Sequence, residues 1–348
     1  MIEEIKIRAI KSIADITLSC SNLNLFVGTN SSGKSTVIQS ILLISQNIEY
    51  KYGLNGPLIS LGDFRDIKNF NINEKEMVIS VKGEGAKLKL QINENIIYNT
   101  DSQIINSKLF HDLNYNNQKL HYLSCHRIGS RDTYEKNLYN IDPFGINGEY
   151  TINYLMEHGS DEIDNKLIKY HESFTLLNQV NYWLKYIINA NVSTENVIGT
   201  DIVKARYSII DGMHVRPKNV GSGISYLVSI IILCLATKED DIVLIENPEI
   251  HLHPLSQSRL CEFLYFIAQS GRQLFVETHS DHFFNGIRAG IALNNFEENM
   301  VKVYFFSLDD NNCTNSTEIK FGRRGKILNP IDNLFDQFDT DLNKMLGI

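Results

Sequence analysis

The residues with the clearest chemical potential lie near the start of the chain, in Gly28-Thr-Asn-Ser-Ser-Gly33-Lys34-Ser35. The spacing G-x-x-x-x-G-K-[ST] is typical of a loop whose backbone N–H groups cradle nucleotide phosphates. In this interpretation Lys34 faces the β- and γ-phosphates of ATP, and Ser35 offers its hydroxyl to Mg²⁺. ATP and Mg²⁺ are therefore the expected cofactors. The predicted nucleotide contacts are Gly28, Thr29, Asn30, Ser31, Ser32, Gly33, Lys34, Ser35 and Thr36.

The residues around this loop predict the elements that must position it. Leu23 to Val27 is an apolar run typical of a buried strand, and the stretch from Ser35 through Leu43 has the spacing of an amphipathic helix. A helix N-terminus carries partial positive charge and favours a bound phosphate. An ordinary glycine-rich turn is the alternative interpretation, and the flanking strand and helix argue against it.

A second motif is acidic, Asp241-Ile-Val-Leu-Ile-Glu246-Asn247-Pro-Glu249, and its apolar part predicts a strand. In phosphate-loop enzymes, a carboxylate at the end of such a strand binds Mg²⁺ and a neighbouring group polarises the attacking water. We therefore predict that Ser35 and Glu246 bind Mg²⁺. Glu246, Asn247 and Glu249 are predicted to belong to the catalytic group.

Two further segments complete the predicted site. The apolar strand Gln273 to Glu277 should carry Thr278 and His279 to the same sheet edge, where His279 would hold the γ-phosphate or its water as a fourth catalytic residue. Upstream, the apolar helix Tyr226 to Leu235 follows a glycine-serine signature. The N-terminus of this helix predicts a second place for an anion. The signature residues are Gly221, Ser222 and Gly223.

This order of motifs resembles ATPase heads of the ABC type, in the compact branch that includes RecF, the SMC proteins and the OLD ATPases. The similarity rests on the opening strand Ile5 to Ser12, the phosphate loop, the acidic segment Glu246 to Pro254, and Glu277 to Asp281. Leu123 to Arg131 and the tail Phe335 to Phe338 are similar to stand-alone bacterial AAA ATPases of defence systems, including Septu-like and retron-associated ones. The resemblance is weakest from Gly148 to Asp201.

The resemblance implies a fold with three regions. The fold is an α/β P-loop NTPase, an ABC-ATPase head with an antiparallel β subdomain and a helical insertion. Residues 1–147 would form the N-terminal lobe with the phosphate loop and the β subdomain, and residues 148–200 the helical insertion. Residues 201–348 would form the C-terminal lobe, with the signature, the acidic strand, the D-loop and the switch histidine.

The resemblance also implies how such a site works. ATP on the phosphate loop of one subunit is closed over by the signature of a second, so a homodimer or higher oligomer forms through ATP. Asn247 stands where these heads usually carry the glutamate that polarises water, and an amide cannot accept a proton at neutral pH. Glu249 is the candidate replacement, and we expect slow turnover. His253 replaces the usual D-loop aspartate, so communication between subunits is also expected to differ.

Three functional classes follow from these expectations. The first is an ATPase that dimerises on ATP and gates a partner effector, a nuclease in antiphage defence, with DNA or RNA contacted directly or through that partner. The second is a nucleotide-bound scaffold with negligible turnover, because of Asn247. The third is a RecF-like ATPase of DNA repair or recombination. Phosphate release separates the first two classes, and stimulation by DNA would favour the third.

Composition limits the partners and the compartment. The chain has 348 residues, a net charge of −8 and a pI near 5.7, which argues against coating nucleic acid by bulk electrostatics. Five cysteines without a C-x-x-C pair suit reduced thiols in the cytoplasm. The most apolar stretch, Tyr226 to Ala236, is too short to span a bilayer, so no membrane contact is expected.

Residue patterns also predict local structure outside the motifs. Strands are expected at Glu3 to Ile10, Glu76 to Gly83 and Lys87 to Ile92. The polar segment Asn93 to Asn117 is expected to form a loop or an insertion, and Tyr150 to Leu184 a helical stretch.

Some polar residues admit two interpretations. His251 and His253 suit a metal pair or, more simply, a structural turn. Arg127 and Arg131 suit either phosphate contacts or ion pairs with nearby acids, namely Asp132 and Glu135. The segment Gly322 to Lys326 suits a small nucleic-acid contact or a solvated turn.

Overall fold

The computed structural model describes residues 1–94, 97–99, 107–138, 142–210, 213–219, 221–293, 295–329, 331, 334–335 and 337–347. At its centre lies a six-stranded sheet in the order β15-β14-β3-β13-β12-β7. Its strands are β3 (Leu23–Gly28), β7 (Leu120–Leu123), β12 (Ile242–Glu246), β13 (Gln273–Glu277), β14 (Val301–Leu308) and β15 (Thr314–Glu318). Neighbouring strands are parallel except β14 and β15. The carboxyl ends of β3, β13 and β12 therefore meet at one edge of the sheet.

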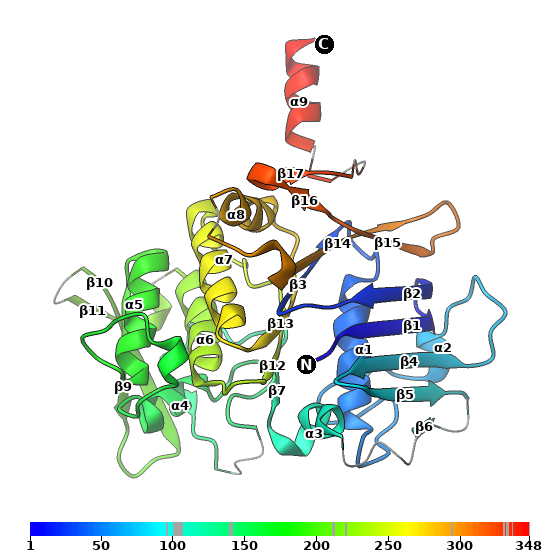
Figure 1. Cartoon of the computed structure of the whole chain (residues 1–348). Helices are drawn as coiled ribbons and strands as arrows, with labels where there is room; N and C mark the ends of the chain where they lie inside the picture. Colours follow the sequence, from blue (N-terminus) through cyan, green and yellow to red (C-terminus); the bar gives the residue numbers. More distant parts are fainter. Residues whose placement is uncertain are drawn as a thin grey trace.

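Helices cover both faces of this sheet (Figure 1). One face packs on α1 (Lys34–Gln46), and the other packs on α6 (Gly223–Ala236), α7 (Pro254–Gln269) and α8 (Asp281–Ala292). Successive residues of β13 serve opposite faces, because Phe275 belongs to the core around α1 and Val276 to the core under the other helices. The predicted α/β fold with a helix after the phosphate loop is confirmed.

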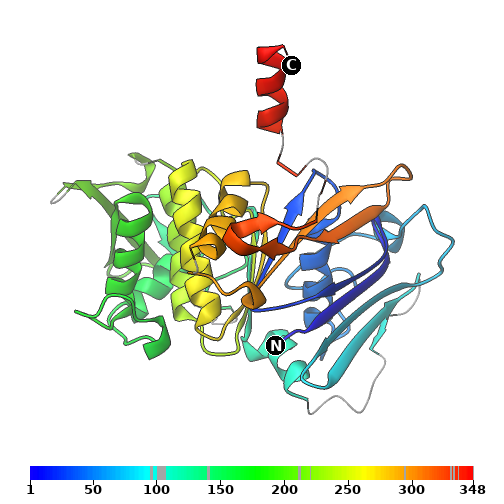
Figure 2. The ribbon, with the colours of Figure 1, turned by 45° about the horizontal axis from the view of Figure 1, so that its top comes forward.

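An antiparallel sheet packs over the outer side of α1 (Figures 1 and 2). Its order is β2-β1-β4-β5-β6, and the side chains of Ile7, Ile79 and Leu90 share one core with Ile38 of α1. This sheet is the predicted β subdomain. Its strands are β1 (Glu4–Ile10), β2 (Ile13–Ser19), β4 (Met77–Gly83), β5 (Ala86–Ile92) and β6 (Ile97–Asn99).

The region expected to be a helical insertion also contains a strand. It holds α4 (Thr151–His158), α5 (Leu176–Ile188) and β9 (Asn191–Asn196). Strand β9 pairs with β10, which also pairs with two short strands. The bounds of these three strands are β8 (Tyr134–Glu135), β10 (Ile202–Ile210) and β11 (Met213–Val215).

The prediction of a helical stretch from Tyr150 to Leu184 was wrong between α4 and α5. Gln179, which belongs to α5, contacts this segment. Its Oε1 accepts the backbone N–H groups of Lys169 and Tyr170, both at 3.0 Å. Its amide group donates in turn to the Tyr170 carbonyl at 2.6 Å. A single buried side chain therefore satisfies backbone groups that a continuous helix would have paired internally.

Of the two alternatives for Asn93 to Asn117, a loop or an insertion, the loop was wrong at β6 (Ile97–Asn99) and at α3 (Lys108–Leu113). Ser107 caps this helix, because its hydroxyl accepts the Phe110 N–H at 3.2 Å, and both Leu109 and Leu113 are buried. Residues 95–96 and 100–106 of the predicted loop lie outside the described residues.

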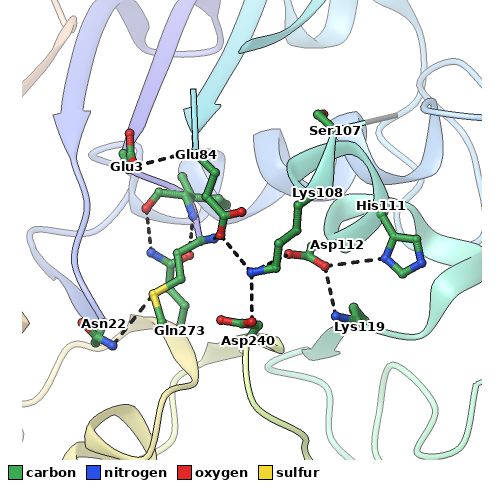
Figure 3. A network of polar contacts seen from close by, with 12 residues as sticks. Glu3, Asn22, Glu84, Ser107, Lys108, His111, Asp112, Lys119, Asp240 and Gln273 are labelled. Carbon is green, nitrogen blue, oxygen red and sulfur yellow. Dashed lines mark hydrogen bonds and ion pairs between the residues drawn. The ribbon is translucent and has the colours of Figure 1, made fainter. Parts of the chain in front are cut away.

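A polar network joins α3 to the two sheets (Figure 3). Lys108 Nζ lies 2.9 Å from both Glu84 Oε1 and Asp240 Oδ2, and Gln273 bonds to the backbone of Ile2 through both its amide oxygen and its amide nitrogen. The network lies at the start of β13. The predicted site lies at the other end of the same strand.

Several shorter elements complete the described chain. No helix within the described ranges is long and apolar enough to cross a membrane. The remaining helices and strands are α2 (Phe64–Ile67), β16 (Phe321–Gly322), β17 (Lys326–Ile327) and α9 (Gln337–Leu346). Helix α9 extends away from the body in Figure 1. Single 3₁₀ turns lie at Tyr115–Asn117, Asn165–Leu167, Pro217–Asn219, Glu298–Met300 and Arg323–Gly325.

Candidate nucleotide site

The loop between β3 and α1 requires glycine at two positions. Gly28 has φ +135°, and a Cβ there would lie 2.0 Å from the Phe306 carbonyl oxygen. Gly33 has φ +101°, and a Cβ there would lie 2.6 Å from Thr314 Oγ1. Both glycines are therefore fixed by conformation and by close contact with β14 and β15. Between them, Thr29, Asn30 and Ser31 form an exposed crest.

Lys34 lies under this crest. Its side chain is almost completely buried, and Nζ donates to the carbonyl oxygens of Gly28 at 3.1 Å and Thr29 at 2.6 Å. Burial lowers the pKa of Lys34, and the nearby Glu277 opposes this effect. Ser32 Oγ also donates to the Thr29 carbonyl, at 2.7 Å, and Thr36 is buried in the first turn of α1. The ammonium group thus lies inside the loop that is predicted to cradle phosphate.

Ser35 contacts a carboxylate that the sequence interpretation left outside the site. Its hydroxyl donates to Glu277 Oε1 at 2.8 Å, across the boundary between α1 and β13. Burial raises the pKa of Glu277 to about 7, and the hydrogen bond from Ser35 opposes this rise. The available sequence signal was a glutamate that ends an apolar strand, the same pattern that singled out Glu246.

Glu246 and Asn247 end the neighbouring strand. Glu246 Oε2 accepts the Cys125 N–H at 3.0 Å, and Glu246 is paired with Glu277 in the sheet register. Asn247 has a left-handed backbone with φ 44°, and its N–H donates to the Glu277 carbonyl at 2.8 Å. Its Oδ1 is buried without a hydrogen-bond partner among the described residues. A buried amide oxygen of this kind can accept a hydrogen bond from a water molecule or ligand.

Glu249 lies beside the predicted switch histidine. Its Oε1 accepts the backbone N–H of His279 at 2.8 Å, and burial raises its pKa. The imidazole of His279 is partly exposed, with Nε2 4.0 Å from Glu277 Oε1, and burial lowers its pKa. The structure therefore brings Glu249, His279, Glu277 and Ser35 to one edge of the sheet.

The signature segment begins α6. A Cβ on Gly223 would lie 2.5 Å from the His251 carbonyl oxygen, so this glycine allows α6 to approach the loop after β12. Gly221 is exposed and Ser222 is half-buried. No hydrogen bond or ion pair joins these three residues to the phosphate loop within the described part of the chain. Of the signature residues, Gly221 and Ser222 are thus accessible to another molecule, and Gly223 is buried.

Among the described residues, Arg127 bonds to backbone carbonyl groups and not to Asp132 or Glu135, the acids named in its ion-pair interpretation. Its guanidinium is buried and donates to the carbonyl oxygens of Glu246 and Asn247, both at 2.5 Å. It also lies 6.0 Å from the centre of the Tyr226 ring on α6. Asp132, a proposed partner of the two arginines, pairs with Lys218 instead, at 3.1 Å. Arg127 therefore fixes the end of β12 through backbone contacts.

The two histidines of the loop after β12 occupy separate environments. His253 caps α7 by accepting the Leu255 N–H at 3.4 Å, and the His251 ring lies 5.4 Å from that of Tyr226. Among the described residues, no group of three or more His, Cys, Asp or Glu side chains is arranged to hold a metal by itself. The structural-turn interpretation fits these contacts.

The residues present suit ATP and Mg²⁺. A buried ammonium group and a helix N-terminus favour phosphate. The hydroxyl of Ser35 and the carboxylates of Glu246 and Glu277 are hard oxygen donors, which Mg²⁺ prefers. In this assignment Mg²⁺ would neutralise phosphate charge, while the chain's own groups orient the triphosphate and the attacking water.

Comparison with known proteins agrees with the fold described above. An SMC head bound to the C-winged helix domain of ScpA is 12% identical with a TM-score of 0.61, over 92% of this chain and 97% of that chain. An SMC head with an extended coiled coil, bound to the C-terminal domain of ScpA derived from Pyrococcus furiosus, is 9% identical with a TM-score of 0.59, over 99% of both chains. At such identities the likeness shows the fold alone, and no curated protein matches. The AAA ATPase domain family matches residues 66–284, and the chain therefore belongs to that family.

Proposed function

We propose that the protein binds Mg²⁺-ATP on residues 28–36 and hydrolyses it slowly, so that nucleotide state controls an assembly. The observation that carries this proposal is the contact set of the loop: Lys34 lies inside the cradle, and Ser35 is bonded to a carboxylate at the end of a central strand. Family membership supports the ATPase activity itself. The assignment of residues 28–36 to nucleotide binding and the slow rate of ATP hydrolysis are what we propose beyond family membership.

Slow hydrolysis is proposed from the side chain of Asn247. An amide cannot take a proton from water, so the work of a general base falls to Glu249. Glu249 is already committed to the His279 N–H through one oxygen, and its raised pKa makes it a stronger base than an ordinary carboxylate when ionised. A nucleotide-bound scaffold with negligible turnover is the second candidate, and the same Asn247 favours it.

Closure by a second copy is proposed from the position of the signature. Gly221 and Ser222 are accessible at the start of α6, and they make no hydrogen bond to the phosphate loop of the same chain among the described residues. A helix N-terminus without a local anion partner can bind the γ-phosphate held by another subunit. ATP would then join two subunits.

A protein partner is proposed as the target of this cycle. SMC heads of the same fold are bound to domains of ScpA. For this chain we propose a nuclease effector in antiphage defence, on the resemblance of residues 123–131 and 335–338. Contact with DNA or RNA would then occur through that partner.

Light scattering after size exclusion tests the nucleotide-dependent assembly. The wild type with ATPγS and Mg²⁺ should double in mass, and Ser222→Arg should stay monomeric while still binding a fluorescent ATP analogue. Lys326→Arg, outside the site, is the matched control. A wild type that keeps one mass with and without nucleotide would contradict closure by a second copy.

A further inference from the structure

Glu277 lies at the end of β13, between the strand of the phosphate loop and the acidic strand. Its side chain is almost fully buried, and its Oε1 accepts the Ser35 hydroxyl proton at 2.8 Å. The same oxygen lies 4.0 Å from His279 Nε2. Glu277 thus contacts the hydroxyl predicted to face Mg²⁺ and lies next to the predicted switch histidine.

Glu246, the carboxylate that the sequence selects for Mg²⁺, is turned to different neighbours. Its Oε2 accepts the Cys125 N–H at 3.0 Å, from the loop after β7. No hydrogen bond joins Glu246 to Ser35 in the part of the chain that the structure describes. The order of the sheet explains this, because β13 lies between β12 and β3.

We propose that Glu277 is a positioning residue for Mg²⁺, which fixes the Ser35 hydroxyl as a ligand and adds negative charge beside it. This inference rests on the proposed function and deepens it. A hydroxyl whose proton is held by a carboxylate keeps its oxygen lone pairs free for a cation. A group that accepts a hydrogen bond from a metal ligand fixes the orientation of that ligand and raises the basicity of the ligand.

A purely structural Glu277 would behave differently. Replacing it with the isosteric glutamine would then alter folding stability, while the Mg²⁺ dependence of nucleotide binding stayed the same. A positioning role predicts a different result. Nucleotide binding without metal survives, since Lys34 and the backbone cradle remain, but the contribution of Mg²⁺ to nucleotide affinity is lost. The measurement must therefore separate nucleotide affinity from metal affinity.

The experiment is a titration of the full chain with a fluorescent ADP analogue, first in EDTA and then at increasing Mg²⁺. It compares the wild type with Glu277→Gln, Ser35→Ala and the double variant. Glu318→Gln is the control, because this partly exposed carboxylate pairs with Lys302 on β14, outside the site. Circular dichroism checks that each variant is folded.

In Glu277→Gln, we expect metal-free affinity within about twofold of the wild type and a half-saturating Mg²⁺ concentration raised about tenfold or more. The increase in Mg²⁺ requirement in the double variant should be smaller than the two single effects combined, because both substitutions break the same contact. A wild-type Mg²⁺ requirement in Glu277→Gln would overturn the inference. So would fully additive effects in the double variant.

Two further results keep the outcomes separate. If Glu277→Gln does not fold, Glu277→Asp takes its place, since it keeps the charge but shortens the reach to Ser35. Its Mg²⁺ requirement should lie above that of the Glu318→Gln control, and a control-like value would overturn the inference. A wild type that binds no nucleotide in EDTA or in Mg²⁺ would refute the proposed function instead.

Discussion

Strands β12 and β13 carry the same pattern but meet different neighbours. Each consists of five buried residues that end in glutamate, and Glu246 and Glu277 lie side by side in the register. Glu246 accepts a backbone N–H from the β7 side of the sheet, whereas Glu277 accepts the hydroxyl of Ser35 from the β3 side. Sheet order therefore decides which of two similar carboxylates reaches the phosphate loop.

The largest expected effect is on ATP turnover in Glu246→Gln and Glu277→Gln. Each removes charge beside the predicted metal, so phosphate release at an Mg²⁺-ATP concentration that saturates the wild type should fall on the order of a hundredfold. A coupled assay of phosphate release measures it. Raising Mg²⁺ should recover part of the activity of Glu277→Gln. Wild-type turnover in either variant would remove that carboxylate from the site.

The stability of the nucleotide-free protein should depend on pH through Glu277. Its pKa rises from 4.5 to about 7 on folding, so its stabilising contribution is complete below pH 4.5 and is lost as pH rises through 7. Relative to Glu277→Gln, the unfolding free energy of the wild type should fall by roughly 2–3 kcal/mol over this range. Urea unfolding at fixed pH values measures it. A difference that does not vary with pH would contradict the buried position of the carboxylate.

Arg127 should matter for stability, since it holds the end of β12 in place. Arg127→Met leaves the carbonyl oxygens of Glu246 and Asn247 without their donor, and should lower the unfolding free energy by about 2 kcal/mol. The matched control is Arg206→Met, whose exposed pair with Glu195 should contribute less than about 1 kcal/mol. An equal loss of unfolding free energy in the two variants would mean that the buried contacts of Arg127 stabilise the fold no more than an exposed ion pair does.

The smallest expected effect concerns the residue after β12. Asn247→Glu should raise the rate of single-turnover hydrolysis about tenfold, because it returns a proton acceptor to the end of the acidic strand. Glu249→Gln should lower the rate in the wild-type background and have less effect once Asn247→Glu is present. An unchanged rate in Asn247→Glu would indicate that this side chain does not face the water.

The central architecture was predictable from sequence because its signals are local. The strand, loop and helix around Gly28 to Ser35 follow from apolar runs and glycine spacing, and the two acidic strands follow from five-residue apolar runs. Strands β1, β4 and β5 of the antiparallel sheet were predicted in the same way, whereas the subdomain itself was expected from the family resemblance. Strand alternation and glycine spacing can be recognised within a few consecutive residues, so the sequence alone reveals them.

The missed features depend on contacts between distant segments. The Ser35–Glu277 bond spans 242 positions, and the Arg127 contacts with the end of β12 span about 120. At shorter range, Gln179 of α5 accepts backbone N–H groups nine and ten residues earlier, in the loop between α4 and α5, and apolar spacing does not signal this contact either. No local pattern distinguishes a glutamate that meets a serine from one that meets a backbone amide.

Binding of a fluorescent ATP analogue to the wild type and to Lys34→Ala tests the account most directly. We predict saturable binding to the wild type and to the control Lys302→Ala. Binding should be lost in Lys34→Ala, since no other ammonium group is bonded to the loop carbonyls among the described residues. Equal affinity in Lys34→Ala and the wild type would place the nucleotide elsewhere and contradict the assignment of the loop.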